Sequence, residues 1–446
     1  MAGTLLAGQV DDRSIPRMRW ARIVPLLIMI NTVSYIDRSN LGYAIAGGLD
    51  ADLKLGAAFS GLAAGVFFWG YLVLQFPGGH WAERGYAKTI MTCSLLAWSC
   101  LTIGMAFVIA GSQLLVMRFI TGSAEGAIFP ATYTILGNWF PARETGRASA
   151  LFITNTATAS LIAGPLSSVI LARYDWHMLF VVEGELSLLL AAAWILLMSE
   201  SPAKARWLGA VERDYILSGV EQDHITLDTA PAAEFSRHDF ICNRNLWLLS
   251  AIYLCYHISN SGFVVWLPTI TKCLTATNIG AVGFLSAVPF VFSLIRLCAF
   301  GTISDRTLNR RRYLVVSMLA FAACLLVAAI LKSDGWAAFA ALALSGLFLK
   351  PAIGLFWTIP KLVFAPQDVG AARGIINDIG NLDGFFGPII VGYATSQTGN
   401  FAAGVFMISA FLLLGAGLTR FLPAVTSSAS GVARNPTHRE YNLQGS

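Results

Sequence analysis

Charged residues are scarce in this chain. Asp, Glu, Lys and Arg make up 12% of its 446 residues, and hydrophobic residues make up 56%. Soluble domains carry about 25% charged residues. The net charge of +5 is small and lies in loops, so it does not indicate a nucleic-acid partner. The composition excludes an ordinary soluble protein and indicates one that crosses a lipid bilayer many times.

Motifs of enzymes and ATPases are also missing. The sequence has neither H-E-x-x-H nor the phosphate-binding G-x-x-x-x-G-K-[ST]. Its cysteines have no metal-ligand spacing, and most lie in apolar runs as packing residues: Cys93, Cys100, Cys255, Cys298 and Cys324. We therefore expect no enzymatic activity, metal or cofactor.

Long apolar runs dominate what is present. Runs of 18 or more residues read as membrane-spanning helices, and about twelve occur. We expect an all-α polytopic membrane protein with spans near 22–46, 58–79, 89–110, 113–137, 148–172, 177–199, 245–269, 279–302, 313–332, 336–360, 371–395 and 401–422.

Every second loop between these runs is basic, for example around Arg84, Arg147 and Arg306. By the positive-inside rule these loops and both termini face the cytosol. The charged start of the chain reads as a cytosolic tail and not as a signal peptide. The expected location is the plasma membrane, in bacteria the inner membrane.

The chain divides at a polar segment. We expect an N-terminal tail (1–21), a six-helix bundle (22–199), a cytosolic central loop (200–244), a second six-helix bundle (245–422) and a C-terminal cytosolic tail (423–446). Within the central loop, 203–224 could form a short amphipathic helix at the surface, and 226–237 reads as a flexible linker.

The two halves repeat one another. Pairs of similar residues recur at offsets of roughly 221 to 226 positions, as in transporters built from parallel repeats. These pairs are Glu83-Arg84 with Asp305-Arg306, Pro130 with Pro351, Arg147 with Arg373, and Gly164-Pro165 with Gly387-Pro388.

The repeated G-x-x-x-[DE]-R loops resemble the signature of the major facilitator superfamily. Within it the chain resembles the anion:cation symporter family, which includes tartrate, phthalate, galactonate and glucarate transporters. The resembling motifs are "YIDRSNLGYA", "QFPGGHWAER", "RFITGSAEGAIFPA", "NWFPARETGRASA", "LFVVEGELSLLLA", "ESPAKARWL" and "FVVWLPTI". The resemblance implies a major facilitator fold of two pseudo-symmetric six-helix bundles.

Asp37 and Arg38 stand side by side inside the first apolar run. Such charges cost several kcal/mol in a membrane unless they are paired or wetted, so they mark function. Neighbours on a helix point about 100° apart and do not face each other. We therefore expect the two side chains to contact different partners.

Arg118 and Glu125 lie seven residues apart on one face of another run, about 10 Å apart along the axis. The alternative for both pairs is a structural salt bridge. In the resembling family these positions line the central cavity, where the acids carry protons and the arginines bind the substrate anion. The resemblance thus implies proton coupling by Asp37 and Glu125, and substrate binding by Arg38 and Arg118.

A second set of polar residues lies in runs expected to face the cavity. The substrate-binding candidates are Tyr71, Tyr256, His257, Asn260, Asn381 and Asp383. The resemblance carries Tyr71 and Asn381, whereas Asp383 and Lys350 depart from the family pattern. Those two could pair with each other or adapt the cavity to an unusual substrate. His257 could equally be a packing residue, and Glu183 reads as structural.

The gating candidates lie in the basic loops: Glu83, Arg84, Asp305, Arg306, Arg147 and Arg373. A loop carboxylate can pair there with basic residues or with a helix end.

The expected function is proton-coupled uptake of an organic carboxylate, such as a sugar acid, tartrate or an aromatic acid, by alternating access. The proton gradient replaces a cofactor, the partners are the acid, protons and lipid, and a monomer is the default. An uncoupled facilitator or exchanger and a non-transporting nutrient sensor remain open. The sequence does not specify the acid.

Overall fold

The computed structural model describes residues 17–228, 240–304, 310–349, 353, 356–364 and 368–422, which form helices and connecting turns without a strand in those ranges. The N-terminal helices are α1 (Met18–Ala46), α2 (Leu49–Asp52), α3 (Ala57–Trp81), α4 (Ala87–Met105), α5 (Gly111–Gly126), α6 (Ile128–Trp139), α7 (Ala142–Arg173) and α8 (Trp176–Leu197). After α9 (Ala210–Asp228) follow α11 (Arg244–Thr275), α12 (Ile279–Ser304), α13 (Arg310–Ile330), α14 (Gly335–Ser345), α16 (Pro360–Val363), α17 (Val369–Gly380), α18 (Asp383–Thr398) and α19 (Phe401–Leu418).

Each of the expected apolar runs contains helix where it is described. Eight helical segments of the described residues are long and apolar enough to cross a membrane, and one of them joins α3 and α4 across a π turn at Ala82–Tyr86. Gly85 makes that turn possible with a φ of 96°, which L residues rarely adopt. The expectation of an all-α polytopic membrane protein is confirmed.

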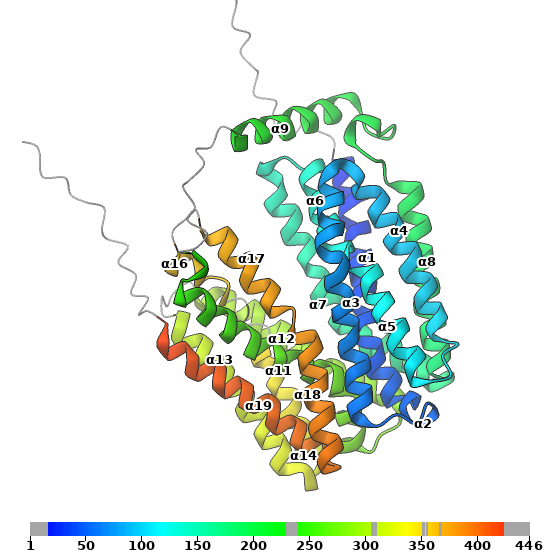
Figure 1. Ribbon diagram of the computed structural model, residues 1–446, viewed down its shortest axis with the longest axis vertical. Helices are drawn as coiled ribbons and strands as arrows, with labels where there is room; N and C mark the ends of the chain where they lie inside the picture. The colour runs from blue at the N-terminus through cyan, green and yellow to red at the C-terminus, as the bar shows by residue number, and fades with distance from the viewer. Residues whose placement is uncertain are drawn as a thin grey trace, which may run out of the picture.

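The helices form two groups (Figure 1). In that view α1 and α3 to α8 lie together, and α11 to α19 lie beside them. α3 packs on α18, α7 on α12, and α1 on α11. At these crossings a Cβ added to Gly61 would lie 2.5 Å from the carbonyl oxygen of Pro388, and one added to Gly283 would lie 2.1 Å from that of Gly164. Close backbone approach through small residues is the usual way in which membrane helices pack.

α9 lies across one end of the first group (Figure 1). It is docked there: buried Arg19 of α1 bonds Glu212 of α9 at 2.7 Å and Glu144 of α7 at 2.6 Å. The backbone N–H of Ala142 donates to Asp223 of α9 at 2.6 Å. The sequence suggested a helix at the surface here. The structure shows that a buried ion pair between Arg19 and Glu212 holds this helix against the bundle.

Candidate functional site

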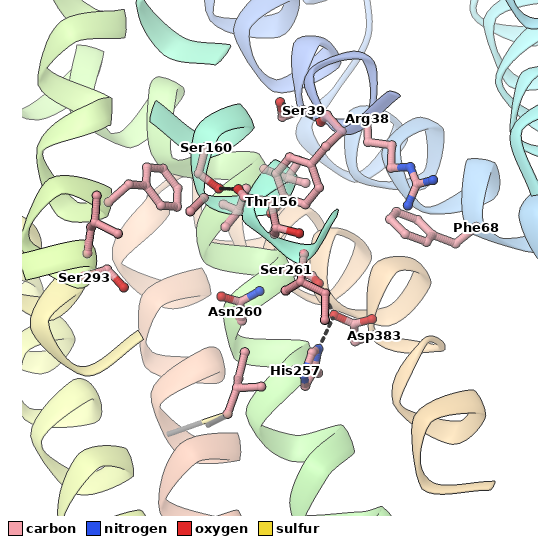
Figure 2. A pocket seen from close by; sticks show the side chains of 18 residues that line it. Arg38, Ser39, Phe68, Thr156, Ser160, His257, Asn260, Ser261, Ser293 and Asp383 are labelled. Carbon is pink, nitrogen blue, oxygen red and sulfur yellow. Dashed lines mark hydrogen bonds and ion pairs between the residues drawn. The ribbon is translucent and has the colours of Figure 1, made fainter. Parts of the chain in front are cut away.

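A cavity of about 500 Å³ lies between the two helix groups. Its walls come from α1, α3 and α7 on one side and from α11, α12 and α18 on the other (Figure 2). Much of the lining is apolar, including Phe68, Val264 and Phe290. Its charged or titratable members among the described residues are Tyr35, Arg38, His257 and Asp383. A mostly apolar cavity with a few convergent polar groups is typical of a small-molecule site.

Arg38 connects this cavity to a buried carboxylate. Its Nε donates to Oε2 of Glu125 on α5 at 3.2 Å, and its Nη2 donates to the hydroxyl of Ser34 at 3.2 Å. That hydroxyl donates to the same Glu125 oxygen at 2.7 Å. The side chain of Arg38 is 24% exposed, whereas that of Glu125 is fully buried. Arg38 therefore faces the cavity on one side and a buried carboxylate on the other.

Two aromatic rings of α3 lie between the arginines. The Arg38 guanidinium sits 4.5 Å from the centre of the Tyr71 ring, and the Arg118 guanidinium sits 4.6 Å from that of Phe67. The two rings stack with centroids 6.3 Å apart. Because ring faces attract cations, this pair stabilises both guanidinium groups away from water.

Asp37 points away from Arg38, as their adjacent positions on a helix require. Its Oδ1 accepts hydrogen bonds from Asn40 and from Thr102 of α4, each at 3.2 Å. The same Asn40 amide also donates to Oε2 of Glu183 on α8. Asn40 thus joins two fully buried carboxylates, Asp37 and Glu183.

Arg118 is fully buried, and its Nε and Nη1 make no hydrogen bond within the described residues. The charged groups that act on it are Asp37, Glu125, Glu183 and Arg38. Three buried carboxylates and buried Arg118 therefore share one region of the first helix group, and partly exposed Arg38 connects it to the cavity. Buried charges are tolerated only when they compensate one another, so the protonation of this cluster must respond to any charge that enters it.

The opposite wall carries a second polar cluster. Nδ1 of His257 on α11 lies 3.4 Å from Oδ2 of Asp383 on α18, and the hydroxyl of Ser261 donates to that same oxygen (Figure 2). Asn260 lines the cavity beside them. The alternative pairing of Asp383 with Lys350 cannot be compared, because Lys350 lies outside the described residues.

Four predicted binding residues are not part of the cavity wall, and fully buried Arg118 is the first of them. Tyr71 is 7% exposed and lies against Arg38. Tyr256 faces away, because its hydroxyl donates to the carbonyl of Leu349. Asn381 lies at the break between α17 and α18. Of the predicted set, Arg38, His257, Asn260 and Asp383 do line the cavity.

The gating candidates fall in different environments. Glu83 and Arg84 are exposed on the π turn, and neither makes an ion pair with another described residue. Arg147 lies over the Trp20 ring at 5.4 Å, and Nη2 of Arg373 donates to the carbonyl of Trp357 at 2.7 Å. Asp305 and Arg306 lie outside the described residues.

Several site residues were missed by reasoning from the sequence. Ser34 connects Arg38 to Glu125, and its spacing of four residues from Arg38 could have indicated this. Thr156 and Ser160, also four apart, line the cavity from α7. Glu183 read as structural, yet it belongs to the same cluster as Asp37 through Asn40. An intramembrane carboxylate was the available signal for it.

Two groups of membrane-spanning helices around a central cavity define a secondary transporter, and not an enzyme. The chain belongs to the Major Facilitator Superfamily, whose model matches residues 27–274. It is an integral, multi-pass membrane protein, and the resemblance seen in its loop motifs is confirmed.

Named relatives and a solved structure agree with this assignment. The chain is 30% identical over 414 residues to the quinolone resistance transporter of Acinetobacter baumannii, covering 92% of this chain and 94% of the relative. It is 26% identical over 428 residues to the hexuronate transporter of Bacillus subtilis, covering 93% and 97%. A bacterial homologue of the human lysosomal transporter Spinster, in an inward-facing and occupied conformation, shares the fold with a TM-score of 0.71, 15% identity and coverage of 91% and 97%.

Proposed function

We propose that this protein takes up a small organic carboxylate together with protons by alternating access. The observation that carries the proposal is the position of Arg38, which lines the cavity and donates to the buried carboxylate of Glu125 at 3.2 Å. A guanidinium binds a carboxylate through two parallel hydrogen bonds, a geometry that suits an anionic substrate. The relative named for hexuronate, a sugar acid, supports the same substrate class.

Coupling follows from competition for Arg38. Before the substrate enters, Arg38 and Ser34 compensate the ionised Glu125. A substrate carboxylate that engages Arg38 removes part of that compensation. An ionised carboxylate without a counter-charge is costly away from water, so Glu125 then binds a proton. Binding of the anion and binding of the proton favour each other, as symport requires.

Asp37 provides a second carboxylate for this scheme. It is separated from the cavity, contacts Thr102 and Asn40, and shares with Glu125 the field of Arg118. When Glu125 becomes neutral, Arg118 is left with fewer negative neighbours, which favours an ionised Asp37. We assign Glu125 to the proton that accompanies substrate binding and Asp37 to the compensation of Arg118 between steps.

The two helix groups and the central loop fit the same proposal. The N-terminal bundle (22–199) and the C-terminal bundle (245–422) would rock about the contacts of α3 with α18 and of α7 with α12. The loop 200–244 and the tails 1–21 and 423–446 would face the cytosol, and the protein would work as a monomer in the plasma membrane. Arg84, Arg147, Arg373 and the loop at Asp305-Arg306 would control the cytosolic opening.

The test uses purified protein in liposomes. Uptake of labelled tartrate, galactonate, glucarate, phthalate and 4-hydroxyphenylacetate is measured with and without an inward proton gradient. The proposal expects at least one acid to accumulate, the accumulation to collapse with a protonophore, and Arg38→Ala to abolish it. Glu221→Gln, which removes an exposed carboxylate of α9 outside the membrane-spanning helices, is the control.

Other outcomes separate the alternatives. Uptake at the same rate with and without the proton gradient would favour an uncoupled facilitator or exchanger, and it would contradict the assignment of a coupled proton to Glu125. Binding of an acid without any uptake would favour the nutrient sensor. Neither binding nor uptake of any acid by folded protein would overturn the proposed substrate class.

A further inference from the structure

The cavity presents different hydrogen-bonding chemistry on its two walls. The charged group on the N-terminal wall is Arg38, which is only a donor. The C-terminal wall contributes Asp383, His257 and Asn260 from α18 and α11 (Figure 2). Apolar side chains such as Phe68 and Val264 and neutral hydroxyl residues complete the lining, the latter including Thr156 and Ser160.

Polar side chains of the C-terminal wall converge on one side of the cavity. Nδ1 of His257 lies 3.4 Å from Oδ2 of Asp383, and Asn260 lines the cavity beside them. Nε2 of His257 and Oδ1 of Asn260 are buried, with almost no accessible surface and no hydrogen-bond partner in the described residues. The Asp383 carboxylate, which lines the cavity, is therefore the acceptor that this wall offers to a ligand.

We propose that this C-terminal wall binds a hydrogen-bond donor carried by the substrate at the end opposite its carboxylate. The inference rests on the proposed function, in which Arg38 takes the carboxylate, and adds that the substrate is bifunctional. The distal donor is a hydroxyl group or a protonated amine. Asp383 is its main acceptor, and Ser261 holds the Asp383 carboxylate in place through its hydroxyl.

The physical reason for selectivity is the cost of unpaired acceptors. A ligand without a distal donor would displace water from the Asp383 carboxylate and return no hydrogen bond to it. A site built to bind a polar group therefore rejects an analogue that lacks it more strongly than an apolar site rejects a missing methylene.

Three benzoates of matched shape test this on the purified full-length protein. 4-(Hydroxymethyl)benzoate carries a hydroxyl donor, 4-(aminomethyl)benzoate carries a cationic donor, and 4-ethylbenzoate carries none. Affinity is measured by titration calorimetry in detergent. We expect at least one of the two donor ligands to bind about tenfold or more tightly than 4-ethylbenzoate.

Variants identify the wall responsible. Asp383→Asn keeps an acceptor but loses the charge, so a preference for the amine should fall by about tenfold while a preference for the hydroxyl changes less. Ser261→Ala should weaken both donor ligands and leave 4-ethylbenzoate unchanged. Ser396→Ala is the matched control, because this exposed residue of α18 bonds only its own helix at the carbonyl of Tyr393.

The outcomes separate this inference from the function beneath it. Equal affinity for all three benzoates would overturn the bifunctional substrate and leave organic-acid transport standing. The inference is also overturned, with organic-acid transport unaffected, if both Asp383→Asn and Ser261→Ala still prefer the donor ligands. Transport of a panel acid by a protein that binds none of the benzoates would have the same meaning. If no acid of the liposome panel is bound or transported, the proposed function and this inference fall together.

Discussion

Arg38 and Glu125 form a closed triangle with Ser34. Nε of Arg38 lies 3.2 Å from Oε2 of Glu125, and the Ser34 hydroxyl contacts both groups at 3.2 Å and 2.7 Å. One corner of the triangle faces the cavity and another is sealed from it. A ligand that draws Arg38 toward the cavity must therefore disturb a carboxylate that the ligand itself does not contact.

The first prediction concerns the protonatable corner. Glu125→Gln keeps the shape of the side chain and its hydrogen bonds to Ser34 and Arg38 but cannot exchange a proton. We expect gradient-driven accumulation to fall about tenfold or more, whereas exchange of labelled for unlabelled acid across liposomes should persist. Counterflow and gradient-driven uptake are measured on the same preparation. Accumulation equal to that of wild type in Glu125→Gln would assign the proton to another group.

The second prediction concerns the amide that joins Asp37 and Glu183. Asn40→Ala removes the donor shared by both carboxylates: Asp37 Oδ1 keeps the hydroxyl of Thr102, whereas buried Oε2 of Glu183 loses its hydrogen bond, at a cost of about 1–3 kcal/mol. We expect a lower melting temperature and slower uptake. Glu183→Gln should instead alter the pH dependence of uptake, because it removes one of the three carboxylates near Arg118.

Glu221→Gln, an exposed carboxylate of α9 outside the membrane-spanning helices, is the control for this pair. A pH profile of Glu183→Gln that matches wild type, with only a lowered melting temperature, would return Glu183 to a purely structural role.

The fold could be predicted from the sequence because the length of an apolar run and the charge of a loop both depend only on residues that are adjacent in the chain. It also singled out Asp37, Arg38, Arg118 and Glu125, since a charge inside an apolar run is visible without a structure. It also predicted that Asp37 and Arg38 contact different partners. It could not show that the partner of Arg38 is Glu125, because that contact depends on how α5 packs against α1.

The same limit explains the aromatic candidates. Tyr71 and Tyr256 are both polar aromatic residues in membrane-spanning runs, yet one lies under Arg38 and the other faces Leu349. Helix rotation about its own axis decides between these outcomes, and tertiary packing sets that rotation. The docking of α9 was hidden for a similar reason, since Arg19 and Glu212 are 193 residues apart.

The third prediction concerns that docking. Glu212→Gln removes one carboxylate from buried Arg19, and breaking a buried ion pair by removing one partner costs about 3–5 kcal/mol. We expect α9 to detach more readily and the segment around it to be cleaved faster by trypsin in detergent. Glu221→Gln, an exposed carboxylate of the same helix, should leave cleavage unchanged. Equal cleavage in both variants would show that Glu144 alone holds Arg19.

The last prediction concerns Asp175, which lies in the turn between α7 and α8 and caps α8. Its carboxylate accepts the N–H of Met178 at 3.0 Å, and this bond, with a smaller contribution from His177, holds the pKa of Asp175 below its ordinary value. Because the folded pKa is lowered, the stabilisation is complete above the ordinary value near 4 and is lost as the pH falls through the folded pKa.

Asp175→Ala should cost about 1 kcal/mol at pH 7. The matching fall in melting temperature is about 2 °C. At pH 3 the difference in melting temperature between Asp175→Ala and wild type should shrink. Asp175→Asn is an equally good cap that does not titrate. Its melting temperature should therefore stay near that of wild type at pH 7 and stay above that of Asp175→Ala at pH 3. Melting curves of the three proteins in detergent at both pH values measure this, and an Asp175→Ala difference that does not shrink at pH 3 would mean that the cap acts through something other than its charge.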